Sequence, residues 1–360
     1  MAHQEKSEWH SFGRQSFEKR RCPICCILPP HMLDKLLQQD DDEQRHSALS
    51  TLRASEQFRG RRTVVRNVSF AVSPGQKRRT IYDAKTGTSL PGVLIRGEGD
   101  PSSDDQAVNE AYDAAGATYD LFREIYERNS IDDRGLRLDA TVHYDSKYEN
   151  AFWNGDQMVY GDGDGRFFNR FTIAIDVIAH ELTHGIIGYE AALDYKNESG
   201  ALNESFADVF GTLVKQRSLQ QTVDQADWLI GTEQFTSKVQ GIALRSLKAP
   251  GTAYDDPVLG KDPQPAHYQD LFQGAFDDGG VHINSGIPNR AFYLTAIAIG
   301  GFAWEKTGKI WYTTLRSGLR SSSSFKDAAA ATVAVAGQLY GQDSDEQKAV
   351  QSAWQQVGVS

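Results

Sequence analysis

Cysteine is scarce in this sequence and is confined to its start. The 360 residues contain three cysteines, Cys22, Cys25 and Cys26, so no disulfide framework can staple the main body. Long hydrophobic runs are also missing: no stretch approaches the roughly 20 apolar residues of a membrane-spanning helix. A basic excess is absent too, because 38 Lys and Arg face 48 Asp and Glu, for a net charge of -10. We therefore expect neither a membrane nor a nucleic acid as partner.

The composition is that of a folded chain with an uneven charge distribution. Hydrophobic residues make up 39% and charged residues 24%, which is ordinary globular usage. The length suggests two or three domains at roughly 150 residues each. Residues 1–60 hold 9 basic and 9 acidic side chains, so residues 61–360 carry the whole charge of -10. We expect residues 1–60 to be a separate unit.

The first 60 residues show no recognisable secretory signal. The opening 20 residues are polar, whereas a signal needs a run of about 7–15 apolar residues. Met32 to Leu37 is typical of a short amphipathic helix. The acidic run Asp40 to Glu43 and the Ser/Thr/Arg-rich stretch after it indicate a solvated linker, which ends at the basic run Arg59 to Arg62.

Residues 61–170 are predicted to be rich in β-structure, and residues 171–360 to be mainly helical. In the first part, apolar positions spaced three and four apart predict one helix near 103–128. Short β-type runs predict strands at Thr63–Val65, Ser69–Val72, Thr80–Tyr82, Val93–Ile95, 136–144, 150–153 and 157–160. Helices are expected at 174–188, 198–217, 284–300, 306–318, 325–340 and 345–356, while 218–281 is irregular. The fold class is therefore α+β, with a boundary near Phe171.

The strongest chemical signal is the pentapeptide from His180 to His184. Residues four apart share one face of a helix, so both imidazoles can reach one ion. Glu181 lies beside them and can act on a water held by that ion. The same pentapeptide can occur on an ordinary soluble helix that binds no metal, so a second observation is needed to identify a metal site.

A catalytic zinc needs a third protein ligand and one open position. Glu204 follows His184 after nineteen residues, at the start of a second apolar-periodic segment, and is the natural third ligand. Asn203 and Asp208 could accept hydrogen bonds from the imidazole N–H groups. The alternative zinc-protease pattern with a third histidine is excluded, because Glu190 stands where that histidine would be.

At this point the sequence resembles the thermolysin family of zinc endopeptidases over about residues 62–360. The matching segments, in the family's order, are Asn150–Trp153, Asp176–His184, Asn197–Asp208, Ala243–Ser246 and Asp277–Gly286. The start, with Pro29-Pro30-His31-Met32-Leu33, looks like the compact propeptide of the protealysin branch. The resemblance implies a two-domain metalloprotease with its cleft between a β-rich domain at 61–170 and a helical domain at 171–360. Residues 1–60 would be a propeptide and linker that inhibits its own enzyme.

The resemblance also implies a role for each matching residue. His180, His184 and Glu204 would bind one zinc, and Glu181 would be the general base that activates the zinc-bound water. The oxyanion would be held by Tyr195 and His282, with Asp277 orienting His282. The substrate would contact Asn150, Ala151, the strand near Trp153, and Arg245, and the residue after the cut would enter a pocket of Phe168, Phe171, Val177 and Leu244. Each residue also has an ordinary structural interpretation: a buried histidine, an ion-paired arginine, a packed tyrosine.

One departure from the family concerns calcium. Relatives often hold two calcium ions near the position of Asp176, and here Lys215 and Thr232 stand where carboxylates are expected. Calcium needs six to eight oxygen ligands. We expect the double-calcium site to be absent, with the Lys215 ammonium in place of the bridging ion. The acidic run Asp162–Gly165 indicates a tight turn.

The three cysteines leave functional and structural interpretations open. Cys22 and Cys25, as a Cys-x-x-Cys pair, could bind zinc or do redox chemistry, or a propeptide thiolate could cap the catalytic zinc and keep the precursor silent. Alternatively, the cysteines could simply pack near Ile27 and Leu28. The remaining histidines, His3, His10, His31, His46, His143 and His267, lack such context and are interpreted as solvent-exposed or structural.

The sequence thus predicts a zinc-dependent neutral endopeptidase, made as a precursor, that cuts before hydrophobic residues. A catalytically silent zinc-binding regulatory protein and a zinc aminopeptidase stay open as alternatives. The first is disfavoured by Glu181, Tyr195 and His282 occurring together, and the second by the lack of a motif for binding a free amine. The expected protein is a monomer that acts on proteins or peptides. The resemblance favours secretion, with a cytoplasmic location as the alternative.

Overall fold

A computed structural model describes residues 26–60 and 76–359, with side chains left out for 55–60. The expected strands Thr63–Val65 and Ser69–Val72, together with Cys22 and Cys25, lie outside the described residues. Among the described residues, no helix combines the length and the apolar character required to cross a membrane.

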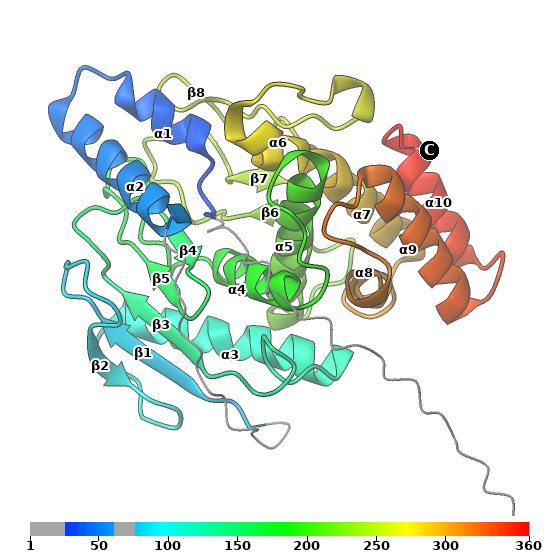
Figure 1. The fold of residues 1–360 in the computed structure, drawn as a ribbon, viewed down its shortest axis with the longest axis horizontal. Helices are drawn as coiled ribbons and strands as arrows, with labels where there is room; N and C mark the ends of the chain where they lie inside the picture. The colour runs from blue at the N-terminus through cyan, green and yellow to red at the C-terminus, as the bar shows by residue number, and fades with distance from the viewer. Residues whose placement is uncertain (1–25, 61–75, 360) are drawn as a thin grey trace, which may run out of the picture.

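A five-stranded mixed sheet forms the β-rich part, in the order β2-β1-β3-β5-β4. Its strands are β1 (Arg79–Asp83), β2 (Val93–Arg96), β3 (Leu138–Val142), β4 (Ala151–Trp153) and β5 (Met158–Tyr160). β1, β3 and β5 pair in parallel, while the edge strands β2 and β4 pair antiparallel to their neighbours. Helix α3 (Gln106–Tyr126) packs its apolar face against the sheet (Figure 1). Edge strand β4 pairs with β5 on one side, and on its other side the chain at Cys26 forms an antiparallel bridge with Phe152.

Helices dominate the rest of the chain, as expected. The long ones are α4 (Ile175–Tyr189), α5 (Asn197–Ser218), α7 (Gly286–Ile299), α8 (Lys306–Ser317), α9 (Phe325–Tyr340) and α10 (Asp345–Gln356). The irregular region holds the short strands β6 (Leu229–Ile230), β7 (Arg245–Ser246), β8 (Asp255–Asp256) and β9 (Gly260–Lys261), a 3-10 turn at Tyr268–Asp270, and α6 (Phe276–Asn284). Helix α4 lies at the centre, between the sheet and α5 (Figure 1). A two-part architecture with a sheet-bearing first half and a helical second half is confirmed.

The prediction of a solvated linker after Asp40 is wrong. Residues Asp42–Gly60 form a 19-residue helix, α2, which packs against α1 (Pro30–Leu37). The composition is polar, but one face is buried: Ala48 and Thr51 have no exposed surface, and Ser47 is 5% exposed. Asp41 starts the helix by accepting hydrogen bonds from the amides of Glu43 and Gln44. Tertiary packing thus overrides a weak local pattern.

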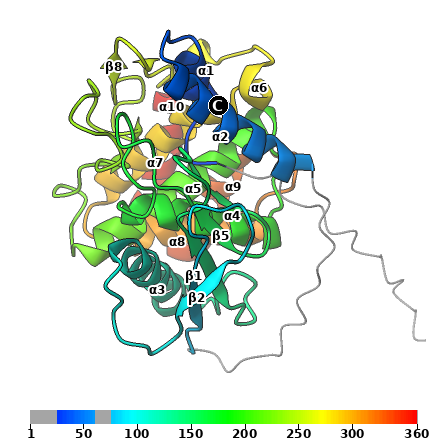
Figure 2. The same ribbon diagram turned by 90° about the vertical axis from the view of Figure 1, so that its left-hand side faces the viewer.

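Helices α1 and α2 sit at the end of the molecule opposite α3, in both views (Figures 1 and 2). Their apolar side chains join the main core: Ile27, Met32 and Leu36 are completely buried, and Leu28 is 1% exposed. The N-terminal segment is therefore an integral layer of this structure. Between Cys26 and α1 the chain descends toward α4 and α5 (Figure 1).

Candidate active site

Two helices bring together a buried group of metal-binding side chains. His180 and His184 project from α4, and Glu204 projects from α5, with their ligand atoms all within 4.8 Å of one another. The two Nε2 atoms face each other at 2.9 Å, and Glu204 Oε2 lies 3.4 Å from His180 Nε2. All three residues have no exposed surface. Two imidazole nitrogens and a carboxylate that converge in this way are the donor set of a three-ligand zinc site.

The opposite ring nitrogens fix the tautomers. His180 Nδ1 lies 2.8 Å from Asp208 Oδ1, and His184 Nδ1 lies 2.8 Å from Asn203 Oδ1. Both acceptors come from α5. Because the Nδ1–H groups donate outward, both Nε2 lone pairs are free to point at the centre. The donor set therefore fits a divalent cation, and the arrangement leaves one Nε2–Nε2 repulsion that only a proton or a cation can relieve.

Burial and charge shift the pKa values of these groups in opposite directions. Burial opposes the charge of His180, but its bonds to Asp208 and Glu204 outweigh it and raise its pKa to about 9. Burial lowers the pKa of His184 to about 4. Despite burial, His282 and His184 hold the pKa of Glu204 well below its usual value. Glu204 is thus kept as a carboxylate, the form that binds a metal ion.

Glu181 lies beside this group with both oxygens unengaged. It is completely buried, and neither carboxylate oxygen has a hydrogen-bond partner among the described residues. Burial is the main cause that raises its pKa to about 8, with His180 acting in the opposite direction. A buried carboxyl with such a pKa, one residue from a metal ligand, suits a group that takes up and releases a proton near neutral pH.

Tyr195 and His282 approach the same centre from the helical half. The Tyr195 hydroxyl donates to Glu204 and lies 3.1 Å from His282 Nε2. Asp277 Oδ1 accepts from His282 Nδ1 at 2.6 Å, and Asp277 Oδ2 accepts from the His282 amide at 2.8 Å. Burial opposes the His282 charge, but Asp277 and Glu204 raise its pKa to about 9. His282 can therefore present an N–H to an oxygen that carries negative charge.

A left-handed turn makes the Asp277–His282 bond possible. The interior of α6 is not helical: Asp277, Asp278, Gly279 and Gly280 all have positive φ. A Cβ on Gly279 would lie 2.1 Å from the Asn197 side-chain oxygen, so this position requires glycine. The turn folds the Asp277 carboxylate back over His282.

Arg245 is held rigidly at the site by Asp208. Its Nε and Nη2 donate to the two Asp208 oxygens, each at 2.8 Å, and the pair is buried. Asn289 Nδ2 also donates to Asp208 Oδ2 at 2.8 Å. Asn289 could not be predicted from the sequence, because a lone asparagine in an apolar helix carries no motif. Asp208 thus links the His180 ring and Arg245 in one network.

The residues expected to contact substrate instead contact the chain's own N-terminal segment. Arg245 Nη1 donates to the carbonyl oxygen of Ile27 at 2.9 Å, and His282 Nε2 lies 3.0 Å from the carbonyl oxygen of Cys26. The Leu28 amide donates to Asn150 Oδ1 at 3.0 Å, and the Ile27 amide donates to the Ala151 carbonyl. This segment occupies the cleft in extended form.

Phe152, rather than Trp153, faces that segment. Cys26 forms an antiparallel bridge with Phe152 and packs with Tyr144, Tyr148 and Phe152 in a small buried cluster. The Trp153 indole lies on the other side, next to Gly185 of α4. Trp153 therefore supports the strand from behind, and the sequence analysis missed the aromatic cluster, whose members come from separate segments.

The four residues expected to form a pocket are all buried in one region. Phe168, Phe171 and Val177 have no exposed surface, and Leu244 is 1% exposed. The Phe168 and Phe171 rings lie 6.3 Å apart, while Val177 and Leu244 both lie against Gly231. Ile27 is also completely buried, and all five residues belong to the main hydrophobic core.

Lys215 lies where the sequence analysis places a substitute for calcium. Its ammonium is 2.8 Å from Asp227 Oδ2 and 3.2 Å from Asp176 Oδ2, and it donates to the Leu229 carbonyl at 3.3 Å. Asp164 Oδ1 accepts the amides of Arg166, Phe167 and Phe168, which makes the run at 162–165 a tight turn.

Comparison with known proteins gives matches along the whole described body. Family models described as the catalytic domain and the alpha-helical domain of thermolysin metallopeptidases match residues 61–188 and 191–359. The extracellular metalloprotease of Pectobacterium carotovorum subsp. carotovorum is 51% identical, over 94% of this chain and 97% of its own length. Protease PrtS of Photorhabdus sp. (strain Az29) is 46% identical, over 92% and 91%. The solved structure of the precursor of protealysin, a metalloproteinase from Serratia proteamaculans, is 52% identical, with a TM-score of 0.86 over 93% of this chain and 100% of that chain.

Proposed function

Because the chain belongs to the thermolysin family of metallopeptidases, we propose that it is a zinc-dependent neutral endopeptidase made as a precursor. The observation that carries the proposal is the convergence of His180, His184 and Glu204 on one point, with the unengaged carboxyl of Glu181 beside it. Bound there, zinc would supply Lewis acidity toward a carbonyl oxygen and a water molecule.

The protein's own groups divide the remaining work. Glu181 takes the proton of the attacking water and passes it to the leaving amine, as its raised pKa allows. Tyr195 and His282 donate to the oxygen that becomes negative, and Asp277 keeps His282 oriented and charged. Asn203 and Asp208 hold the ligand imidazoles.

Substrate is held as an added strand. Asn150, Ala151 and Arg245 offer one acceptor or donor each to a peptide backbone lying along β4, as they do for residues 27–28. The residue after the cut enters the pocket of Phe168, Phe171, Val177 and Leu244. Burial of a Leu, Ile, Val or Phe side chain there would contribute roughly 1.5–3 kcal/mol, which favours hydrophobic residues at this place.

Residues 1–60 act as an intramolecular inhibitor in this proposal, and residues 61–170 and 171–360 form the two catalytic domains. Support comes from the position of Cys26, Ile27 and Leu28 in the cleft and from the buried faces of α1 and α2. The protein is further proposed to be a secreted monomer, in line with relatives that are named extracellular. The double-calcium site is replaced by the Lys215 ammonium.

The test replaces Glu181 with glutamine. Zinc content measured by atomic absorption should stay at one per chain, while hydrolysis of casein and of a blocked peptide with a central Leu or Phe should fall to background. Glu305→Gln, at an exposed glutamate, is the matched control and should keep full activity. Casein hydrolysis that survives Glu181→Gln would contradict the mechanism, and activity only on peptides with a free N-terminus would indicate an aminopeptidase.

A further inference from the structure

The peptide bond between Cys26 and Ile27 lies across the catalytic groups in the position of a bond to be cut. We propose that the precursor hydrolyses this bond in its own chain, and that the cut nicks the inhibitor without releasing it. The inference rests on the peptidase function proposed above and adds a specific first product: a chain that begins at Ile27.

The carbonyl side of the bond faces the oxyanion donors. The Cys26 oxygen lies 3.0 Å from His282 Nε2, whose ring Asp277 holds and whose Nε2 is 3.1 Å from the Tyr195 hydroxyl. A carbonyl in this place is polarised by the same groups that would stabilise its tetrahedral form.

The amine side of the bond is equally well placed. The Ile27 amide donates to the Ala151 carbonyl, and the Ile27 carbonyl accepts from Arg245 at 2.9 Å. Ile27 is completely buried and belongs to the main hydrophobic core. Ile27 is thus the residue after the cut, and its side chain is of the type the pocket favours.

Anchors on both sides hold this register. On one side Cys26 pairs with Phe152 as an antiparallel bridge. On the other side Leu28 is bound by Asn150, and His31 Nε2 lies 2.6 Å from the Tyr254 hydroxyl. A shift of one residue would break these contacts together, so a single peptide bond is presented.

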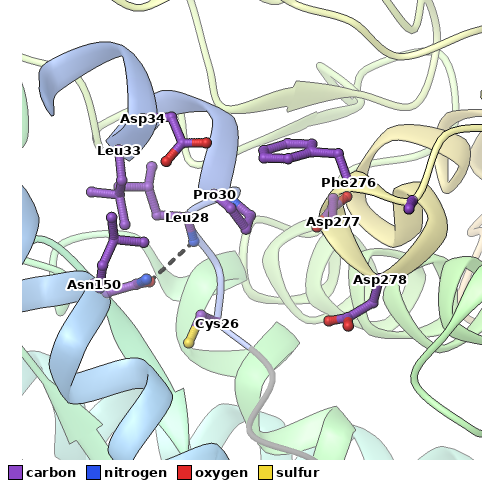
Figure 3. Close-up of a pocket in the computed structure, with 11 residues that line it drawn as sticks. Cys26, Leu28, Pro30, Leu33, Asp34, Asn150, Phe276, Asp277 and Asp278 are labelled. Atoms are coloured by element: carbon purple, nitrogen blue, oxygen red, sulfur yellow. Dashed lines mark hydrogen bonds between the residues drawn. The ribbon is translucent and has the colours of Figure 1, made fainter. Parts of the chain in front are cut away.

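Water can lie beside the segment that carries this bond. A pocket of about 350 Å³ opens beside the segment and is lined by Cys26 and Leu28, with Asn150 on one side and Asp277 and Asp278 on the other (Figure 3). At about 30 Å³ per molecule, it has room for about ten waters.

The reaction consumes one water and no other reagent. The water oxygen bonds to the Cys26 carbonyl carbon, and the bond from that carbon to the Ile27 nitrogen breaks. Glu181 carries the two water protons in turn to the Ile27 nitrogen, which leaves as an ammonium group, and Cys26 ends as a carboxylate.

The fragment that begins at Ile27 would stay bound in the part of the cleft that holds the residues following the cut bond. Leu28, Met32, Leu33 and Leu36 are each at most 2% exposed, and all lie downstream of the broken bond. Residues 27–60 therefore keep Arg245 and the pocket occupied, and full activity requires a second cut beyond α2. The nick is the first of two steps in maturation.

The experiment follows purified, zinc-loaded precursor over time by intact-mass and N-terminal analysis. A species that begins at Ile27 should appear before casein-hydrolysing activity, at a rate independent of protein concentration, and should be absent from Glu181→Gln. Ile27→Gly, which removes the buried side chain after the cut, should slow this cut at least tenfold, whereas Ile27→Leu should preserve it.

A second measurement tests, without any catalysis, whether the segment around Cys26 lies buried in the cleft. In zinc-free Glu181→Gln precursor, mass mapping should show Cys26 at least tenfold slower to react with iodoacetamide than in denatured protein, because it is 2% exposed. If Cys26 reacts with iodoacetamide as fast in the native precursor as in the denatured protein, the inference is overturned.

The outcomes separate the two proposals. A protein that matures and hydrolyses casein while the Cys26–Ile27 bond stays intact in every fragment overturns the inference and leaves the peptidase function standing. A rate that rises in proportion to concentration overturns the intramolecular cut. A protein that hydrolyses neither its own chain nor casein overturns the peptidase function, and the inference with it.

Discussion

Replacing Lys215 with methionine tests whether an ammonium stands in for a calcium ion. The change keeps most of the side-chain volume and removes the charge that lies 3.2 Å from Asp176 and 2.8 Å from Asp227. Asp176 is completely buried and its Oδ1 has no hydrogen-bond partner among the described residues. The variant would therefore leave a buried carboxylate without its compensating charge.

The loss of stability can be estimated from the two partners. Breaking a buried ion pair costs about 3–5 kcal/mol. The Asp227 side chain is 41% exposed, so solvent screens its share and the lower end, about 3 kcal/mol, applies. For a body of this size, each kcal/mol lowers Tm by roughly 2–4 °C, so Lys215→Met should lower Tm by roughly 6–12 °C.

The pH dependence of the loss has a definite sign. Burial raises the pKa of Asp176, and Lys215 works against that rise. Without Lys215 the folded-state pKa rises further above its unfolded value of 3.8, so the folded protein favours the protonated acid. The stability that Lys215→Met loses is therefore zero below pH 3.8, and the loss grows as the pH rises toward the folded-state pKa of Asp176.

The assay is thermal unfolding in zinc-containing buffer, with and without calcium chloride. Lys238→Met, at an exposed lysine, is the control for losing one positive charge. Lys215→Glu should make Tm rise with calcium, because it adds a carboxylate to Asp176 and Asp227. The reasoning is refuted if Lys215→Met costs no more than Lys238→Met, or if the unaltered protein binds calcium beside Asp176.

Three further predictions address separate parts of the molecule. Hydrogen bonding to Asp162, aided by Asp105, raises the pKa of His143 to about 9. The contribution of the charged His143 to the free energy of unfolding is therefore complete below the unfolded pKa of about 6.5 and is lost as the pH rises through about 9. Urea unfolding should therefore show His143→Gln less stable than the original by about 1–3 kcal/mol at pH 6 and equally stable at pH 10.5; a gap that stays constant would contradict this. Tyr195→Phe should lower kcat by about 10²–10³ with little change in KM, and steady-state kinetics of the mature protein would expose a KM effect instead. Leu36→Ala removes a completely buried side chain from α1 and should weaken the inhibitor's hold by about 2–5 kcal/mol, which would appear as faster onset of casein hydrolysis; unchanged onset would show that α1 does not hold the segment in place.

Local sequence predicted most of the elements and the metal-binding group. The spacing of His180 and His184 needs only a helix to bring both rings to one side, and α4 supplies it. Ser344 caps α10 by accepting from the amide of Gln347, and the Gln347 side chain accepts from the amide of Asp343. Interactions within one or two helical turns are therefore predictable from neighbouring residues alone.

Helix α2 shows where such patterns are insufficient. Its sequence is polar enough to be interpreted as a linker, and only contact with the body makes one face of it buried. Ser47, for example, donates to the carbonyl of Lys147 and to Glu149, a hundred residues away. Propensity within α2 could not predict those partners, because the stabilisation comes from surfaces that meet only in the folded protein.

The sequence by itself determined the chemistry: which side chains can bind a metal ion, which carboxyl lies beside them, and the family to which the chain belongs. Only the tertiary structure decided what lies in the cleft. Cys26 and Ile27 are more than 200 residues from His282 and Arg245 in the chain, yet their carbonyls contact those two side chains directly. The physical reason is that backbone oxygens are the same in every residue, so no sequence pattern marks which of them a distant donor will meet.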